Sequence, residues 1–439
     1  MTDHIDVIGA GLAGCEAAIK IASLGIKTKL YDIKPSKMSD AHSIGGLAEL
    51  VCSNSLKSVS LENASGILKE EMHILDSIVI ESAYKNRVPA GNALAVDREA
   101  FSAYITDAIH KNKKIEFICR EVCSINPGQM TVIATGPLTT ECLSAFITEI
   151  TGLGNMYFYD AASPVVMAES IDMETAFRAS RYGKGGDDYI NCPMDKKQYE
   201  RFMEFLLSAE RVNPRKFEKR DIFEGCMPLE IMASRGFDTL RFGPMKPVGL
   251  TDPRTGKTPY AVVQLRTENL SNTMYNLVGF QTSLKFGEQK KMLSLIPGLK
   301  NVEIARYGAM HRNTYINSPA VLDGTCAVKA NPNIFFAGQI TGVEGYLESA
   351  ATGIAAGLNA AMRFLGKEPV VFGNETLTGA LLEYISGNKS HVFQPMNANF
   401  GILRPLDEHL PDKRKKAEMY ADRALKAMAD AAAGIKRVV

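Results

Sequence analysis

The feature that most constrains the fold is a glycine-rich turn near the start of the chain. A short apolar run at residues 5–8 (IDVI) leads into it, and residues 15–24 after it have the apolar spacing of a helix. The turn consists of Gly9, Ala10, Gly11, Leu12, Ala13 and Gly14. Glycines at its first, third and sixth positions suit a tight turn, a close approach of backbone to pyrophosphate, and close helix–strand packing. Because the N-terminus of such a helix binds phosphate, the turn predicts a dinucleotide-binding βαβ unit.

An acidic residue completes this unit. Residues 28–31 (TKLY) read as the second strand, and Asp32 follows directly. A carboxylate about 20 residues beyond such a turn accepts hydrogen bonds from ribose hydroxyls. Asp32 is therefore a predicted cofactor-binding residue.

The rest of the chain alternates helix and strand at both ends but not in the middle. Residues 98–111 have helical spacing, and 115–118 and 132–134 read as strands. Between about 150 and 310 this alternation fades, and Gly and Pro clusters recur. A buried strand at 334–337 and a small-residue helix at 348–364 then resume the pattern.

We therefore predict an α/β protein of two domains, a Rossmann-like FAD-binding fold with an inserted α+β domain. The first part of the FAD-binding domain covers 1–150, and the inserted domain, which we expect to bind substrate, covers 151–309. The second part of the FAD-binding domain, with C-terminal helices, covers 310–439.

The glycine turn alone does not distinguish FAD from NAD. Residues 132–136 (VIATG) and 333–357 resemble the flavin-contacting segments of two-domain flavoproteins. This likeness predicts that Gly338, Gln339 and the helix start after Tyr346 lie against the cofactor. The alternative is that the small residues there only serve a close-packed helix.

Composition excludes several classes of protein. The formal net charge is +1, so any nucleic acid must bind through a local patch. No run approaches the roughly 18 apolar residues of a membrane span, and the first residues are too polar for a signal peptide. We expect a soluble cytoplasmic protein that binds no membrane.

The eight cysteines show no CxxC spacing, and no histidine cluster stands at zinc spacing. We expect thiols, with neither disulfides nor a metal site. Cys52 lies in a polar segment and Cys226 in a Gly- and Pro-containing turn, so both are candidate nucleophiles. Most of the others are expected to be small buried hydrophobes, namely Cys15, Cys119, Cys123, Cys142 and Cys326.

Six longer segments carry a family resemblance. They are 52–57 (CSNSLK), 180–194 (SRYGKGGDDYINCPM), 223–230 (FEGCMPLE), 238–250 (DTLRFGPMKPVGL), 278–289 (VGFQTSLKFGEQ) and 306–319 (RYGAMHRNTYINSP). In order and spacing they resemble the folate- and FAD-dependent tRNA (uracil-5-)-methyltransferases, over nearly the whole chain. The flavin segments are more distantly similar to the glucose-inhibited division protein A family.

The resemblance implies an activity and roles for particular residues. It implies FAD as methylene carrier, NAD(P)H as reductant and 5,10-methylenetetrahydrofolate as one-carbon donor. The implied product is 5-methyluridine at uridine 54 in the T-loop of tRNA. Cys226 would be the nucleophile, Cys52 the base or the holder of the one-carbon unit, and Tyr346 would stack near the isoalloxazine.

Basic and aromatic side chains are further candidates. Six could hold folate glutamate or RNA phosphate, or could be solvated charges: Arg241, Lys246, Arg266, Lys285, His311 and Arg312. Residues 211–220 and 413–416 are basic runs that suit RNA or a solvated helix face. Four aromatic residues could stack on pterin or base: Tyr182, Tyr189, Phe280 and Phe286.

Other functions stay open at this point. The same chemistry could act on ribosomal RNA. A FAD-containing protein that binds and folds RNA, with structural cysteines, is an alternative without methyl transfer. A plain NAD(P)H–flavin oxidoreductase is disfavoured, because no second GxGxxG marks a separate nicotinamide site.

Overall fold

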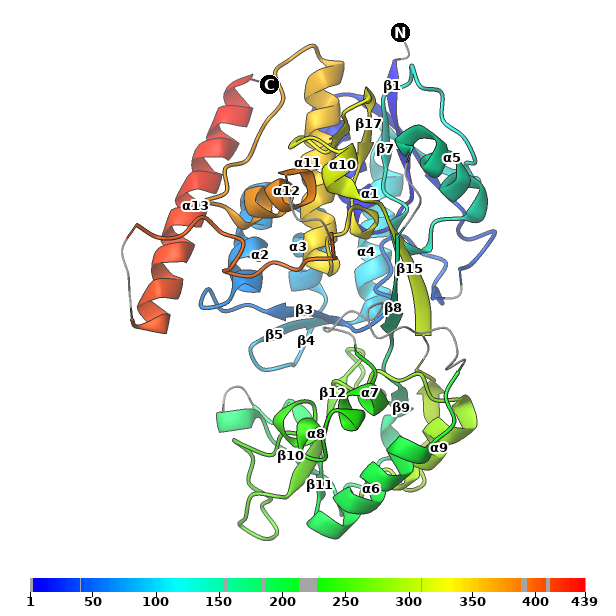
Figure 1. Ribbon diagram of the computed structural model, residues 1–439, viewed down its shortest axis with the longest axis vertical. Coiled ribbons are helices and arrows are strands. Elements are labelled where there is room, and N and C mark those ends of the chain that lie inside the picture. Colours follow the sequence, from blue (N-terminus) through cyan, green and yellow to red (C-terminus); the bar gives the residue numbers. More distant parts are fainter. Residues whose placement is uncertain are drawn as a thin grey trace.

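The structure is a computed structural model that describes residues 3–39, 41–152, 156–183, 186–212, 227–308, 310–387, 393–407 and 411–438. Two bodies of secondary structure stand one above the other in Figure 1, each built on its own sheet. The upper body combines segments from both ends of the chain, and the lower body is formed by the middle. Each body has its own hydrophobic core.

A mostly parallel sheet forms the centre of the upper body. In spatial order its strands are β16 (Ala327–Val328), β17 (Asn331–Phe336), β7 (Thr131–Ile133), β1 (His4–Ile8), β2 (Lys27–Asp32) and β6 (Ile115–Cys119). All neighbours pair in parallel except β16, which runs antiparallel to β17. Parallel strands need both faces covered, and Ile5, Val7 and Val132 are fully buried. The predicted α/β, Rossmann-like fold is confirmed.

Two helices pack closely against each other beside this sheet, α1 (Leu12–Ser23) and α11 (Tyr346–Phe364). A Cβ atom on Gly353 would lie 2.3 Å from the carbonyl oxygen of Ala13, and one on Gly357 would lie 2.6 Å from Cα of Ala17. Such distances are available only to glycine. Gly353 and Gly357 therefore serve the close packing of α11 against α1. This conclusion does not depend on what the start of α11 contacts.

Further helices surround the upper sheet. They are α2 (Ala64–Ile74), α3 (Ile78–Lys85), α4 (Arg98–Lys111), α5 (Glu141–Thr151), α10 (Ser318–Val321), α12 (Leu377–Gly387) and α13 (Lys413–Val438), with 3₁₀ turns η1 (Gly136–Leu138) and η6 (Gln339–Thr341). The long α13 runs along the outside, in contact with α2 (Figure 1). Among the described residues, no helix combines the length and apolar character that a membrane crossing requires.

The lower body is an antiparallel sheet with helices. Its strands in spatial order are β10 (Phe177–Arg178), β11 (Tyr189–Met194), β12 (Ala261–Thr267), β13 (Met274–Leu277), β9 (Val165–Met167) and β14 (Ile304–Arg306). Its helices are α6 (Lys196–Ser208), α7 (Leu229–Ser234), α8 (Thr239–Phe242) and α9 (Phe286–Ser294), with 3₁₀ turns η2 (Ala168–Ser170) and η3 (Arg181–Gly183).

Two smaller sheets lie between the bodies in Figure 1. A two-stranded ribbon of β8 (Met156–Ala161) and β15 (Met310–Tyr315) carries the chain down to the lower body and back. A three-stranded sheet in the order β3 (Ser55–Ser58), β5 (Ala93–Val96), β4 (Arg87–Val88) forms the underside of the upper body. The antiparallel sheet of the lower body meets the upper body at this underside.

Three expectations about single residues are wrong. Cys123 and Cys142 form a disulfide with Cα atoms 4.9 Å apart, because the loop after β6 returns against the start of α5. Cys119 is exposed, since it ends the edge strand β6. Phe280 cannot stack on a ligand because it is fully buried in the lower core. Cys15 and Cys326 are buried, as predicted.

Candidate dinucleotide site and the Cys52 segment

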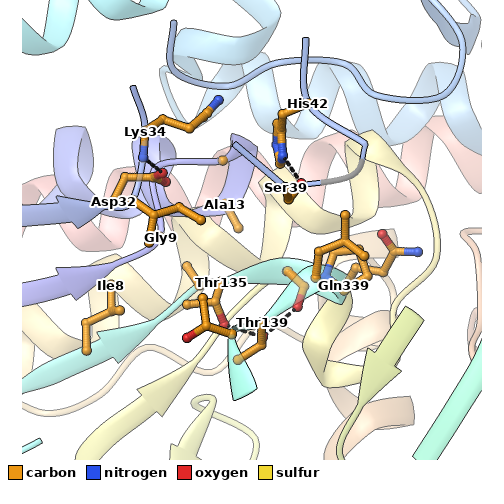
Figure 2. Close-up of a pocket in the computed structure, with 18 of the residues that line it drawn as sticks. Ile8, Gly9, Ala13, Asp32, Lys34, Ser39, His42, Thr135, Thr139 and Gln339 are labelled. Atoms are coloured by element: carbon orange, nitrogen blue, oxygen red, sulfur yellow. Dashed lines mark hydrogen bonds between the residues drawn. The ribbon is translucent and has the colours of Figure 1, made fainter. Parts of the chain in front are cut away.

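An open cavity lies where the strands of the upper sheet end. Its walls come from the glycine turn, the ends of β2, β6 and β7, and the start of α11. Ligands of open α/β sheets bind at these carboxyl ends. Of the predicted site residues, the cavity is lined by Gly9, Gly11, Leu12, Ala13, Asp32, Gly338, Gln339 and Tyr346. Figure 2 shows Gly9, Ala13 and Asp32 on one side and Gln339 on another.

Each of the three glycines of the turn occupies its position for a different structural reason. Gly9 has φ +98°, and a Cβ atom there would lie 2.5 Å from the carbonyl oxygen of Ala134. A Cβ on Gly14 would lie 1.7 Å from the carbonyl oxygen of Gly9. A Cβ on Gly11 would contact no protein atom within 4 Å, although Gly11 lines the cavity. Packing therefore demands Gly9 and Gly14, whereas Gly11 keeps the backbone open to a ligand.

Asp32 is held in place by backbone donors. Its Oδ2 accepts a hydrogen bond from the N–H of Ala10 at 2.6 Å, and its Oδ1 accepts one from the N–H of Lys34 at 2.9 Å. Figure 2 shows the bond to Lys34. A carboxylate has about four acceptor positions, so both oxygens can still accept from ribose hydroxyls. Ala10 itself is buried and does not line the cavity; it orients Asp32.

The start of α1 offers free donors. Its N-cap is Gly11, and no side chain caps the helix. The first N–H groups of a helix have no partner within it, and the macrodipole favours an anion there. Leu12 and Ala13, which supply these groups, line the cavity. This uncapped helix start fits the pyrophosphate of FAD.

The turn after β17 lies against the start of α1. Gly338 has φ +81°, and a Cβ atom there would lie 2.9 Å from Cβ of Ala13. Its N–H donates to Oγ1 of Thr352 in α11 at 2.9 Å. Gln339 donates through Nε2 to Oε2 of Glu344 at 2.7 Å. The turn is thus fixed against both α1 and α11.

Several lining residues were not predicted. They include Lys34, Ser39, Glu49, Arg120, Glu121, Val122 and the segment 137–140. Figure 2 shows Ser39 bonded to His42 and Thr135 bonded to Thr139, with oxygen–nitrogen and oxygen–oxygen distances of 2.5 and 2.6 Å. Most of these residues follow the carboxyl end of β2, β6 or β7. Their position after a strand of the parallel sheet is the sequence signal that could have identified them.

Cys52 lies next to the cavity. Its backbone N–H donates to the hydroxyl of Tyr346 at 2.7 Å, and both Tyr346 and the preceding Val51 line the cavity. Cys52 is half-buried and does not itself line it. The structure thus brings two of the three predicted catalytic residues together. Cys226 lies outside the described residues.

The basic candidates divide by location. Arg266 is buried, and Arg241 is bound to Asp238 and to the carbonyl of Tyr260. Lys246 is exposed, and Lys285 is exposed with an ion pair to Glu210. The side chains of His311 and Arg312 lie outside the described ones, as does most of 211–220. Residues 413–416 are exposed at the start of α13.

The aromatic candidates also differ. Tyr182 and Phe286 are exposed by 63% and 60%, so both rings are available to a ligand. Phe286 also packs against Tyr307 with ring centroids 4.6 Å apart. Tyr189 is half-buried and donates to the carbonyl of Ala90 at 2.9 Å, which joins the lower sheet to the upper body.

Comparison with known proteins identifies the family. Residues 4–368 match the family described as glucose inhibited division protein A. The chain belongs to this family. The chain is also similar to a solved structure of Aquifex aeolicus GidA, with a TM-score of 0.73 and 19% identity, over 98% of this chain and 73% of that one. A second crystal form gives a TM-score of 0.68 and 18% identity, over 99% and 78%. At these identities the likeness shows the fold alone.

Several proteins with higher identity bear the name methylenetetrahydrofolate–tRNA-(uracil-5-)-methyltransferase TrmFO. The Acetivibrio thermocellus protein of this name is 58% identical over 97% of this chain and 98% of its own. The Caldicellulosiruptor bescii protein is 57% identical over 96% and 97%, and the Staphylococcus aureus protein 55% identical over 97% and 98%. The resemblance to this family, predicted from the sequence, is confirmed.

Proposed function

We propose that this chain is a methylenetetrahydrofolate–tRNA (uracil-5-)-methyltransferase, which forms 5-methyluridine at uridine 54 in the T-loop of tRNA. The observation that carries the proposal is the contact between Cys52 and Tyr346 beside the cavity that the glycine turn and Asp32 line. A thiol-bearing segment thus adjoins the cavity wall, as group transfer next to a flavin requires. Relatives of this name are 54–58% identical to this chain over nearly its whole length.

The cavity residues would hold FAD. The N–H groups at the start of α1 would bind its pyrophosphate, and Asp32 would accept hydrogen bonds from its ribose. Gly11 lets the backbone approach, and Gly338 and Gln339 form a neighbouring wall. Bound FAD supplies electron transfer from NAD(P)H and carriage of the one-carbon unit from methylenetetrahydrofolate.

The chain's own cysteines supply the activation of uracil. Carbon C5 of uracil is a weak nucleophile, and addition of a thiolate to C6 converts it into an enolate. In this step the sulfur–C6 bond forms, the C5–C6 π electrons form a C4=C5 bond, and the π electrons of the C4 carbonyl move to its oxygen. We assign the attacking thiolate to Cys226. C5 then forms a bond to the one-carbon unit, and Cys52 removes the C5 proton as the bond from that carbon to its carrier breaks, which leaves an exocyclic C5=CH2. A hydride that derives from NAD(P)H adds to this carbon and makes it a methyl group, so that C5=C6 reforms and the Cys226 thiolate leaves.

The division of the chain follows the same proposal. We assign dinucleotide binding to 1–150 and 310–439, and substrate binding to 151–309. Exposed basic and aromatic residues of the lower body, such as Lys246 and Tyr182, are candidates for contacts with RNA or folate. NAD(P)H would bind transiently at the flavin face, since the sequence holds one dinucleotide turn of this kind.

A covalent trap tests the assignment of the nucleophile. The FAD-loaded protein is incubated with a tRNA transcript that contains 5-fluorouridine, methylenetetrahydrofolate and NADPH. Fluorine at C5 blocks release, so we expect a protein–RNA adduct stable in denaturing gels, present in Cys52→Ala and absent in Cys226→Ala. An adduct that persists in Cys226→Ala contradicts the assignment. An adduct with ribosomal RNA fragments but not with tRNA favours the ribosomal alternative.

A further inference from the structure

The segment that carries Cys52 is clamped by one buried arginine. Arg98, the first residue of α4, donates through Nη1 to the carbonyl of Leu50 and through Nη2 to the carbonyl of Cys52, the latter at 2.8 Å. Its side chain is 7% exposed. A planar guanidinium can reach two carbonyls at once, whereas an ammonium group acts as a point donor. Two backbone positions of the Cys52 segment are therefore set by one side chain.

The lower sheet holds this arginine in place. Nε of Arg98 forms an ion pair with Oε1 of Glu268, whose side chain is 5% exposed and which directly follows β12. The same carboxylate oxygen pairs with Nη2 of Arg306 in β14 at 3.3 Å. Buried charges are costly unless paired, so Glu268 and Arg98 depend on each other. The connection crosses from the lower body to the upper one.

A second set of bonds ties the same segment to the same strand. Asn54 is fully buried and donates to the carbonyls of Val96 and Thr267 at 3.0 and 2.9 Å. Its Oδ1 accepts from Nε of Arg266 at 3.0 Å. On the other side, the N–H of Cys52 is held by Tyr346. Both backbone groups of Cys52 thus have a side-chain partner, one from α11 and one from α4.

We propose that Arg98 is the positioning residue of Cys52, and that Glu268 of the lower sheet keeps Arg98 in the position that sets the Cys52 backbone. The role of Cys52 in catalysis rests on the proposed function, but its placement by Arg98 does not. The lower body, which we assign to substrate binding, is in this way connected to a residue at the cofactor cavity.

Thiol alkylation tests the placement without any assay of activity. The FAD-loaded protein is treated with iodoacetamide, and the modification rates of Cys52 and Cys119 are measured in the same sample by mass spectrometry. Cys119 is exposed on the edge strand β6 and serves as internal reference. Loss of a charged hydrogen bond frees the segment, so we expect the Cys52 to Cys119 rate ratio to rise about tenfold in Arg98→Lys and Glu268→Gln. The matched control is Arg87→Lys, an exposed arginine with one bond to the Gly91 carbonyl, and it should leave the ratio unchanged.

A charge-swapped variant separates positioning from simple ion pairing. Arg98→Glu combined with Glu268→Arg can restore the ion pair but not the two carbonyl contacts. We expect its rate ratio to stay as high as in Arg98→Lys. A ratio restored to the wild-type value, or an unchanged ratio in both single variants that retain FAD and fold, would overturn the proposal. If the swapped variant does not fold, the ratio in Arg98→Lys decides.

Kinetics then connect placement to the proposed function. A displaced catalytic group lowers turnover more than binding, so Arg98→Lys should lower kcat about 100-fold and change KM for tRNA by less than about threefold. An effect on KM alone contradicts a positioning role. A wild-type protein without methyltransferase activity contradicts the proposed function instead, and the alkylation result stands independently.

Discussion

Gly14 in α1 lies so close to Gly9 that a Cβ atom on Gly14 would lie 1.7 Å from the Gly9 carbonyl oxygen. No such obstacle exists at Gly11, where a Cβ would meet no protein atom within 4 Å. The two positions of one motif thus separate packing from ligand binding. The backbone angles of Gly11, φ −75° and ψ −167°, are also accessible to alanine.

The pair Gly14→Ala and Gly11→Ala tests this separation. We expect Gly14→Ala to destabilise the fold by about 1–3 kcal/mol or more, since an overpacked backbone contact must move. Gly11→Ala should keep the melting temperature of the FAD-free protein and weaken FAD binding, because its methyl group enters the cavity. Thermal unfolding and flavin fluorescence titration measure the two effects. Equal losses of stability in both variants would contradict the interpretation.

Asp32→Asn is expected to weaken FAD binding about 10- to 100-fold, which corresponds to about 1.4–2.8 kcal/mol. The amide keeps one acceptor, so it can no longer accept from the N–H groups of both Ala10 and Lys34 while facing ribose. Flavin fluorescence gives the dissociation constant. The matched control is Asp107→Asn on the exposed face of α4, which should bind FAD as the wild type does. Unchanged affinity in Asp32→Asn would remove Asp32 from the site.

A buried glutamate gives the fold a pH dependence. Burial raises the pKa of Glu71 from 4.5 to about 7, against the opposing bonds from Thr378 and Leu377. The folded state therefore retains a proton that the unfolded state loses between pH 4.5 and 7, and stability falls as pH rises through this window. The slope is at most about 1.4 kcal/mol per pH unit for one such group.

We expect Glu71→Gln to reduce this loss of stability between pH 5 and 7. Some loss remains, because burial also raises the pKa of Glu16 to about 7. Melting temperatures at pH 5, 6, 7 and 8 measure the difference, and Glu149→Gln on the exposed side of α5 serves as control. A melting profile in Glu71→Gln that parallels the wild type would show that Glu71 does not titrate in this range.

Asn54→Ala should destabilise the contact between the two bodies. The change removes the amide that donates to the carbonyls of Val96 and Thr267 and that accepts from the buried Arg266. Each buried polar group left without a partner costs about 1–3 kcal/mol. We expect a lower melting temperature and faster hydrogen exchange at Thr267 and Val96. Asn301→Ala, at an exposed position, is the control. Unaltered exchange at both residues would contradict the role of Asn54.

Local patterns predicted the elements that depend on short stretches of sequence. The helix expected at 98–111 is α4 with the same bounds, since Asp97 caps it by accepting from the N–H of Ala100. The helix expected at 348–364 begins two residues earlier, at Tyr346, where Gly345 ends the preceding turn. Glycine spacing likewise predicted the contacts of Gly9 and Gly14.

Contacts between distant segments were beyond such patterns. The bond between Asn54 and Arg266 spans 212 residues, and neither residue carries a signal of the other. The Cys123–Cys142 disulfide depends on how the loop after β6 returns. The cavity wall at Arg120 follows from the parallel pairing of β2 with β6, which places it beside Asp32. These features come from tertiary structure, not from local spacing.

The most direct test of the central claim follows the transferred carbon. The FAD-loaded protein is incubated with unmodified tRNA, NADPH and methylenetetrahydrofolate labelled in its methylene carbon, and the product nucleosides are mapped by mass spectrometry. We expect labelled 5-methyluridine at position 54 with the wild type and none with Cys226→Ala. If tRNA stays unmethylated although the bound flavin can be reduced, the proposed methyltransferase function is contradicted.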